Sequence, residues 1–406
     1  KFLSDPKTGL LYQWNGQYFE PYHFEHVRKI VDKKLGIEGN RARMEETVYK
    51  VRVKSGIPRD REMNDCSDWL CLKNGMLNVR TLELKEHDFS YHATNKLNVA
   101  YNPDSKAQCT RFLRFLEETV QDQGPINQIQ EFFGYCLIKE VPFAKSLFLL
   151  SPGSGGRSVL LKVLREMIGP ENVSTIALQE MEDQFHRSAL YQKMVNIATE
   201  VDSKAIESHY FKAATAGDPI SAAFKHQDPF SFTPFAKQIF AFNKLPKVLD
   251  NSDGFYRRIL PIQFKAQFME DNPATDPFLE EKLLNELSEI FHWSLIGLHR
   301  LLEQRKFTDC EETRELLLGY KRLNNPIVCF IEDQCQIGED RQAPKSEIYE
   351  RYENYCRKNR YKAFSKENFF RELYAAVNNL KVSRPRRNNP GRKAYLSGIS
   401  LSGYGT

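Results

Sequence analysis

The segment Leu147-Phe-Leu-Leu-Ser-Pro-Gly-Ser-Gly-Gly-Arg-Ser158 joins an apolar run to a glycine-rich loop. A stretch with helical character, Val159 to Ile168, follows the loop at once. A strand, a glycine loop and a helix in this order form the layout of a phosphate-binding P-loop. The usual pattern, G-x-x-x-x-G-K-[ST], is broken twice, because Ser151 stands at the first glycine position and Arg157 at the lysine position. The segment therefore predicts a nucleotide site, and the two substitutions raise the question of whether the nucleotide is hydrolysed.

Short apolar segments alternate with helical ones on both sides of this loop, between about residues 143 and 268. Such alternation predicts an α/β fold with a parallel sheet. A long helix is predicted from Glu280 to Gln304, where apolar residues recur at helical spacing. The strands predicted by this pattern are Ser146–Leu150, Met194–Thr199, Ala236–Phe242 and Ile259–Phe264.

The composition is that of an ordinary globular protein, since 41% of the 406 residues are hydrophobic and 27% are charged. The length suits two or three domains, and no apolar run approaches the roughly 18 residues of a membrane-spanning helix. The net charge of +5 is small, so nucleic-acid binding has to come from local basic patches. The chain begins at Lys1 without a signal-like segment, and we interpret it as part of a longer or processed polypeptide.

Eight cysteines are scattered along the chain without a C-x-x-C pair. This usage fits a reduced, intracellular compartment. Cys66 and Cys71 come closest to a metal-ligand pair, but free thiols are the favoured interpretation because no Cys/His spacing suits zinc.

Two regions precede the predicted sheet. Residues 1–105 mix hairpins and short helices in a small α+β domain, in which Asn15-Gly16 predicts a hairpin turn. A helix is predicted over Glu25–Leu35, closed by Gly36. Helical periodicity over Cys109–Val120 and Ile126–Leu137 predicts a helical linker at 106–142.

Two further regions complete the predicted division. The α/β region is expected to span 143–310, and a separate domain 311–406. In the last domain the pattern predicts helices over Lys345–Asn359 and Ser365–Val377, followed by a β-ribbon. This order is typical of a winged helix.

Polar residues follow or precede the predicted strands in a recognisable order. Glu200 and Asp202 come directly after the strand that ends at Thr199, where a carboxylate can hold Mg²⁺ or activate water. Asn243 follows the next strand and is placed to orient an attacking water. The pair Arg257-Arg258 precedes the last strand, the place from which one subunit of a ring ATPase reaches its neighbour's γ-phosphate. Taken singly, these residues fit solvated strand ends and surface charge, so the prediction depends on their combined order.

In order and spacing these residues resemble the superfamily 3 helicase module of phage and plasmid primase-helicases, a group that includes the poxvirus primase-helicase. The resemblance covers nearly the whole chain and is close to the C-terminal half of phage primase-polymerases. A primase or polymerase domain is therefore expected before Lys1 in the full-length protein. The matching segments beyond the nucleotide motifs are Asp65-Cys-Ser-Asp-Trp-Leu-Cys-Leu-Lys-Asn-Gly-Met-Leu-Asn-Val79, Phe132-Phe-Gly-Tyr135, Gly217-Asp218, Asp228-Pro-Phe-Ser-Phe-Thr-Pro234, Arg257-Arg258 and Gly398-Ile-Ser-Leu401.

The resemblance implies an AAA+-like ATPase that uses ATP and Mg²⁺ and forms a homo-oligomeric ring, usually a hexamer, around DNA. Glu200 then corresponds to the Walker B carboxylate, Asn243 to sensor 1, and Arg257 or Arg258 to the arginine finger, with Arg258 favoured. Ser158 and Glu200 are expected to hold Mg²⁺. The nucleotide contacts that it implies are Gly153, Ser154, Gly155, Gly156, Arg157, Ser158 and Asp202.

The resemblance also assigns a DNA contact to Lys225-His226, which lies between the short predicted strands Ile220–Phe224 and Phe230–Phe232. In this family such a hairpin points into the ring channel, where a lysine and a histidine contact single-stranded DNA. Without the family, the same two residues are interpreted as an exposed turn.

The segment Lys381-Val-Ser-Arg-Pro-Arg-Arg-Asn-Asn-Pro-Gly-Arg-Lys393 holds six basic residues and no acidic one. Between two predicted strands it is expected to form the wing of the winged helix and to lie along phosphates of duplex DNA. A solvated basic loop is an equally good interpretation. The DNA contacts predicted here are Arg384, Arg386, Arg387, Arg392 and Lys393.

The sequence thus predicts an ATP-dependent DNA helicase module of a phage or plasmid replication protein, located in the host cytoplasm and not bound to a membrane. Arg157 leaves a second function open, because arginine is not a conservative replacement for lysine where a compact charge is needed. That second function is a DNA-binding ring with little or no ATPase activity, serving as a scaffold for a polymerase-primase domain. A third is an origin-recognition module that acts as a monomer through the winged helix alone.

Overall fold

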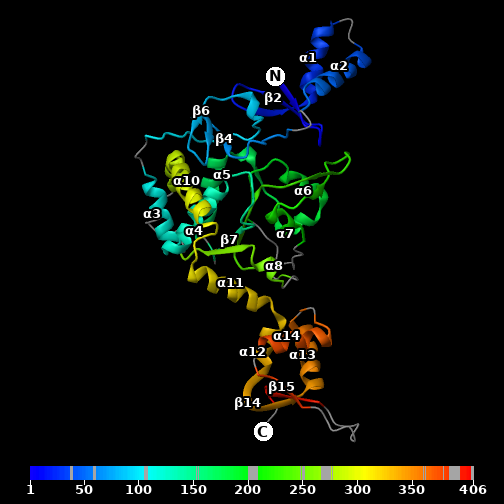
Figure 1. Cartoon of the computed structure of the whole chain (residues 1–406), viewed down its shortest axis with the longest axis vertical. Helices are drawn as coiled ribbons and strands as arrows, with labels where there is room; N and C mark the ends of the chain where they lie inside the picture. Colours follow the sequence, from blue (N-terminus) through cyan, green and yellow to red (C-terminus); the bar gives the residue numbers. More distant parts are fainter. Residues whose placement is uncertain are drawn as a thin grey trace. The chain divides into compact units, whose positions relative to one another are not determined.

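The computed structural model (Figure 1) divides into two compact units, and each is described by itself. The first unit comprises Lys1–Pro246 and Asp253–Arg314, and the second comprises Lys247–Ser252 and Glu315–Thr406. The residues that the structure describes are 1–36, 40–57, 61–104, 108–151, 153, 155–199, 209–246, 248, 252–266, 276, 278–359, 361, 363–377, 379–383 and 394–403.

A five-stranded sheet with every neighbouring pair parallel forms the centre of the first unit. The predicted parallel α/β sheet is therefore confirmed, with the four predicted strands each within two residues at either end. The apolar runs that predicted them are almost fully buried, as expected for strands covered on both faces. In spatial order the strands are β13 (Ile259–Gln263), β7 (Ser146–Leu150), β12 (Lys237–Phe242), β9 (Val195–Ala198) and β8 (Val173–Ser174).

Two helices that approach each other very closely cover part of this core, namely α4 (Gln123–Tyr135) and α10 (Leu287–Gln304). A Cβ atom on Gly134 would lie 2.4 Å from the Leu298 nitrogen, and one on Gly297 would lie 2.3 Å from the Gln130 oxygen. Glycine is thus required on both helices at the crossing. The other helices of this region are α3 (Thr110–Thr119), α5 (Arg157–Ile168), α6 (Gln184–Arg187), α7 (His209–Ala216), α8 (Asp253–Tyr256) and α9 (Leu279–Leu284).

A buried ion pair also links α4 and α10. The Glu131 side chain is fully buried, and one of its carboxylate oxygens accepts a hydrogen bond from Arg300 Nε at 2.7 Å. The other oxygen accepts the Thr308 amide at 2.8 Å. These partners offset the free-energy cost of removing the carboxylate from water. A buried carboxylate without such partners would strongly destabilise the fold.

The single helix predicted over Glu280–Gln304 is divided into α9 and α10, with a break at Asn285 and Glu286. The Glu286 carboxylate accepts the backbone amides of Arg111 at 3.3 Å and Phe112 at 3.1 Å, in the first turn of α3. Unpaired amides at a helix N-terminus favour a carboxylate. Glu286 therefore adopts a non-helical conformation that lets it cap a distant helix.

The N-terminal part of the first unit is built from two antiparallel sheets and a helix pair. The hairpin predicted at Asn15-Gly16 is confirmed, with Gly16 at a φ of +102°. The helix predicted over Glu25–Leu35 is also confirmed and ends at Gly36. The elements are β1 (Phe2–Ser4), β2 (Leu11–Trp14), β3 (Phe19–Tyr22), α1 (Phe24–Leu35), α2 (Arg41–Lys54), β4 (Trp69–Leu72), β5 (Gly75–Asn78) and β6 (Leu84–Lys85).

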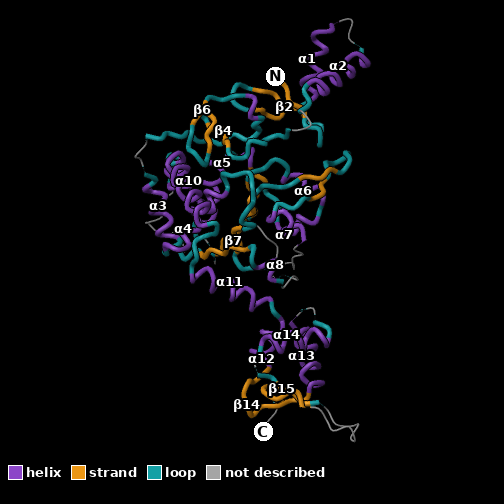
Figure 2. Tube along the Cα trace, in the orientation of Figure 1, coloured by secondary structure: helices purple, strands orange, loops and turns teal. Residues whose placement is uncertain are grey.

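The second unit packs helices against a three-stranded antiparallel sheet with the order β14-β16-β15 (Figure 2). Its core includes Tyr352 and Phe369, whose ring centroids are 4.3 Å apart. Both predicted helices and the final ribbon are confirmed. The elements in chain order are α11 (Glu311–Asn324), which begins in the first unit, then α12 (Pro326–Gln334), β14 (Cys335–Pro344), α13 (Lys345–Asn359), α14 (Lys366–Ala376), β15 (Lys381–Ser383) and β16 (Tyr395–Leu401).

Lys237, the first residue of β12, is a cation inside the core and only 1% exposed. Its ammonium group donates hydrogen bonds to the carbonyls of Ile138 and Phe235 and lies 4.8 Å from the centre of the Tyr135 ring. Burial lowers the pKa of Lys237 to about 7.

Within the described residues, none of the helices is long and apolar enough to cross a membrane. The eight cysteines are free thiols, and no group of three His, Cys, Asp or Glu side chains in the described ranges is arranged to hold a metal ion. The four-domain division remains a prediction.

Candidate functional site

The strands β7 and β12 end side by side, since Leu150 pairs with Phe242 in the parallel register. The loop that follows β7 and the loop that follows β12 therefore leave the sheet at the same edge. The carboxyl edge of a parallel sheet is where ligands bind in open α/β folds. The glycine-rich loop and Asn243 are thus brought together, as the sequence predicted.

Ser151, which stands at the first glycine position of the motif, is buried under the loop that it begins. Its hydroxyl donates to the Gly153 carbonyl at 2.9 Å, and its amide donates to the Phe242 carbonyl at 3.3 Å. A Cβ atom on Gly155 would come within 2.3 Å of the Ser151 hydroxyl oxygen. At the position of the usual glycine, Ser151 thus forms one hydrogen bond within the loop and one to β12.

Gly156 has a φ of +90° and forms the N-cap of α5. A Cβ atom at this position would lie 2.9 Å from a Thr119 methyl group and 3.0 Å from the Phe115 ring. Packing against α3 therefore requires glycine here, irrespective of any ligand. Gly153, in contrast, is exposed and has open space around it. Ser154 lies outside the described residues.

Arg157, the first residue of α5, extends its guanidinium group over the end of β12. Nη1 donates to the Phe242 carbonyl, and Nη2 donates to the Asn243 side-chain oxygen at 2.7 Å. Partial burial lowers the pKa of Arg157, which stays charged nonetheless. A cation is thus fixed between the glycine-rich loop and the predicted sensor residue, and Ser158 lies exposed beside it.

The strand β9 lies next to β12 in the sheet, with Ala198 opposite Phe240. Its carboxyl end therefore points toward the same edge as the glycine-rich loop. The predicted carboxylates Glu200 and Asp202, which follow this strand in sequence, lie outside the described residues.

The two arginines lie at the opposite edge of the sheet, because Arg258 directly precedes β13 and its carbonyl accepts both donors of Ser146, the first residue of β7. The Arg258 guanidinium donates to the Gly254 carbonyl at 2.5 Å and is half-buried. The Arg257 side chain is exposed. A five-residue strand spans about 16 Å, so neither arginine lies beside Arg157 of its own chain.

Lys225 and His226 lie exposed at the turn of the antiparallel hairpin formed by β10 (Ile220–Ala222) and β11 (Phe230–Phe232). The predicted hairpin is confirmed, and His226 adopts a φ of +64°. The rings of Phe224 and Phe230 stack at 5.2 Å beneath the turn. The sequence analysis did not predict this ring contact, although the positions of the two phenylalanines on either side of Lys225-His226 indicate it.

The basic tip residues Arg384, Arg386, Arg387, Arg392 and Lys393 lie outside the described residues. The strands that flank them, β15 and β16, are paired through Val382 and Leu396. The predicted ribbon is therefore present, and the predicted DNA contacts of its tip remain predictions.

Comparison with known proteins gives three separate family matches along the chain. Residues 1–121 match the family "D5 N terminal like", residues 149–258 match a family of unknown function (DUF5906), and residues 322–396 match "Poxvirus D5 protein-like". A curated relative is the "Putative helicase L207/L206" of Acanthamoeba polyphaga mimivirus, which is 24% identical over 239 residues. These matches support a viral primase-helicase-like protein.

The alignment with the mimivirus relative covers 57% of this chain but 22% of the relative. The aligned part therefore amounts to less than a quarter of the length of that protein. Two solved structures of the NrS-1 C-terminal region in the apo state share the fold, with TM-scores of 0.54 and 0.53 and 11% identity. Each alignment covers 98% of this chain and 96% of the other. The similarity therefore extends over the fold of nearly the whole chain.

Proposed function

We propose that the chain is the AAA+-like, superfamily 3-type ATPase module of a DNA helicase in a viral replication protein. The observation that carries this proposal is the contact of Arg157 with Asn243 at the carboxyl edge of the parallel sheet. A cation at the start of a helix and a polar side chain from the adjacent strand are the groups that surround nucleotide phosphates in such folds. Similarity to a viral helicase sequence supports the assignment.

In this proposal ATP binds with Mg²⁺, and the residues present fit that ligand. The exposed Gly153 leaves open space for phosphate oxygens, and the exposed Ser158 presents its hydroxyl at the first turn of α5. Ser158 and Glu200 would hold the Mg²⁺ ion, with Asp202 close by in sequence. Arg157 would supply positive charge to the phosphates, and Asn243 would orient the attacking water.

The place of the two arginines supports the proposal of a ring of subunits. Because they lie at the edge of the sheet opposite to Arg157, they serve a nucleotide only if it belongs to another subunit. The exposed Arg257 is better placed for this role than Arg258, whose guanidinium is held by Gly254. We therefore assign the arginine finger to Arg257 in a ring of six subunits, with Lys225 and His226 directed to single-stranded DNA.

The second unit has the element order of a winged helix and is assigned to duplex DNA. From α12 onward, three helices and three strands occur in the order helix, strand, helix, helix, strand, strand. The basic tip between the last two strands supplies Arg386 and Arg387 for phosphate contacts. A polymerase or primase domain in the same full-length protein completes the proposed assembly.

The alternative function is a DNA-binding ring with weak or no ATPase activity, a scaffold for the polymerase or primase domain. One observation favours it. Both arms of the Arg157 guanidinium are engaged by protein acceptors, so phosphate binding requires their release. A misplaced cation of this kind costs on the order of a hundredfold in rate for an error of about 1 Å.

Steady-state ATP hydrolysis, measured with and without single-stranded DNA, separates the two functions. The helicase function predicts DNA-stimulated turnover that Glu200→Gln abolishes while nucleotide binding is kept. The scaffold function predicts DNA binding with negligible turnover in the unmodified chain. Light scattering tests the ring in the same samples, and monomers at micromolar concentration with nucleotide and DNA would contradict both functions.

A further inference from the structure

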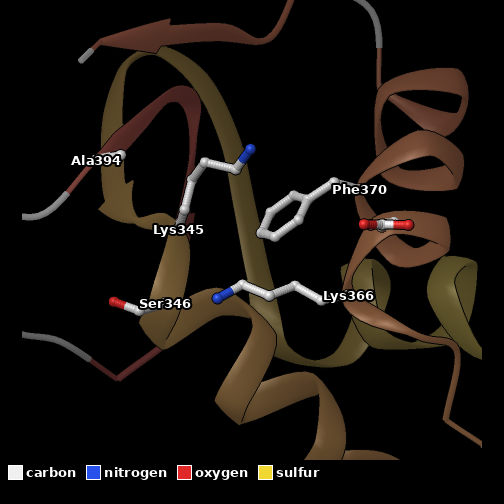
Figure 3. A pocket seen from close by; sticks show the side chains of 6 residues that line it. Lys345, Ser346, Lys366, Phe370 and Ala394 are labelled. Carbon is white, nitrogen blue, oxygen red and sulfur yellow. The ribbon is translucent and has the colours of Figure 1, made fainter.

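A cavity of about 610 Å³ lies in the second unit, between the first turns of α13 and α14 and the residue that precedes β16 (Figure 3). None of the residues that line this cavity belongs to the nucleotide site or to the basic tip. The lining residues are Lys345, Ser346, Lys366, Glu367, Phe370 and Ala394. We refer to this cavity as the α13–α14 pocket.

The two lysines of the pocket occupy equivalent places, because each is the first residue of its helix. The Lys345 amide donates to the Ala394 carbonyl at 2.8 Å, which fixes the start of α13 against the strand pair β14–β16. Ser365 caps α14 by accepting the Asn368 amide at 3.4 Å. The positions of both lysines are therefore set by the fold and not by a flexible loop.

The ammonium groups of these lysines are held by aromatic rings. Lys345 Nζ lies 4.0 Å from the centre of the Phe370 ring and 5.6 Å from that of Tyr374, and Lys366 Nζ lies 5.9 Å from that of Tyr349. Figure 3 shows the Lys366 side chain extending from α14 toward Ser346 on α13. An aromatic face attracts a cation but does not neutralise it.

No carboxylate among the described residues forms an ion pair with Lys345 or Lys366, although Glu367 also lines the pocket. The C-terminal segment around the pocket also has a positive net charge. Residues 315–406 contain 17 Lys and Arg against 10 Asp and Glu, a net charge of +7, while the whole chain carries +5. The excess of positive charge is thus concentrated in the C-terminal segment, where the pocket is found.

We propose that the α13–α14 pocket binds a backbone phosphate of duplex DNA through Lys345 and Lys366. Ammonium groups are ordinary ligands of backbone phosphates. The inference rests on the proposed function, because it assumes that the second unit meets duplex DNA. Ala394 directly follows the basic segment 381–393, so the pocket extends the predicted duplex contact beyond the tip.

The test compares Lys345→Gln/Lys366→Gln with Lys358→Gln in the full chain. Lys358 is exposed on the last turn of α13, about 20 Å along the helix from the pocket, and serves as the matched control. Fluorescence anisotropy measures binding to two unrelated 20-base-pair duplexes over a range of salt concentrations. Each lost phosphate contact reduces the slope of log affinity against log salt by about 0.9.

The double variant is expected to lower the slope by nearly 2, which corresponds to about 60-fold weaker binding at 0.1 M salt for both duplexes. A slope and affinity equal to those of the Lys358→Gln control would overturn the proposal. If the double variant loses binding of a labelled ATP analogue and keeps duplex binding, the pocket holds a free nucleotide, and the proposal also fails.

Hydrogen exchange of the unmodified chain provides a measurement that does not depend on the folding of a variant. Duplex DNA should protect the amides at the start of α13 and α14, and an absence of protection at both would contradict the pocket. If the unmodified chain binds no duplex at 50 mM salt, the proposed duplex-binding role of the second unit fails. If the unmodified chain binds duplex DNA and the two lysine substitutions do not weaken that binding, the proposal for the pocket fails while the duplex-binding role of the second unit stands.

Discussion

Replacing Arg157 by lysine should lower the stability of the nucleotide-free protein and strengthen nucleotide binding. The guanidinium bridges two acceptors, the Phe242 carbonyl and the Asn243 side chain. A lysine ammonium is a single compact donor group that does not reproduce this planar fork. The change Arg157→Lys therefore releases Asn243 and provides the cation that ordinary P-loops present to phosphates.

The size of the effect follows from the two hydrogen bonds that are lost. A net hydrogen bond contributes about 0.5–1.5 kcal/mol, and Arg157 is only partly buried, so the pair amounts to about 1–2 kcal/mol. This free energy opposes nucleotide binding, because the arginine has to leave both acceptors to reach a phosphate. Its removal should tighten binding by about 5- to 30-fold and lower the stability of the nucleotide-free protein by a similar free energy.

Calorimetric titration with a non-hydrolysable ATP analogue and Mg²⁺ measures the affinity, and denaturant unfolding measures the stability. Arg165→Lys is the matched control, since Arg165 is exposed near the other end of α5. Weaker binding by Arg157→Lys would refute the reasoning and show that the pocket is built around arginine. If neither Arg157→Lys nor Ser158→Ala alters binding or hydrolysis, the loop is not the phosphate site.

Three further predictions concern other parts of the first unit. Lys225→Ala with His226→Ala should weaken single-stranded DNA binding and flatten its salt dependence, because phosphate contacts release counterions; unchanged anisotropy titrations would contradict the hairpin assignment. Lys237→Met should reduce the rise of the unfolding free energy between pH 7 and 10, measured by denaturant unfolding. Since burial lowers the pKa of Lys237 to about 7, the unfolded chain binds more protons in this range, and wild-type stability rises with pH by up to about 1.4 kcal/mol per unit; equal slopes for variant and wild type would contradict this. Gly134→Ala should cost about 1–3 kcal/mol or more, because the new methyl group would lie 2.4 Å from the backbone of α10. Gly319→Ala, on α11 with open space around it, is its control and should stabilise the protein slightly.

Elements whose signals are local could be predicted from the sequence. The strand Ser146–Leu150 is an uninterrupted apolar run followed by a glycine-rich loop, and the structure gives it the predicted bounds. The hairpin at Asn15-Gly16 and the helix Lys345–Asn359 also depend on neighbouring residues and were predicted correctly. In each case the burial pattern and the turn residues are read within a window of about ten residues.

Features that depend on distant partners could not be predicted. The break between α9 and α10 arises because Glu286 caps α3, which is 174 residues away in sequence. The contact of Arg157 with Asn243 joins residues 86 apart, and their side-chain geometry is decided by the parallel register of β7 and β12. Likewise, the pairing of Lys345 with Phe370 depends on how α13 and α14 pack.

The three glycines of the loop do not support a phosphate site equally. Gly155 and Gly156 made the motif recognisable, but both are required by neighbouring side chains, Ser151 in one case and Phe115 in the other. Their presence is therefore explained without a nucleotide. Gly153 has no such neighbour, and its open space lies in the same loop that places Arg157 against Asn243. The case for a phosphate site consequently depends on this convergence of an open loop, a cation and a polar strand end, which is what the Arg157→Lys titration examines.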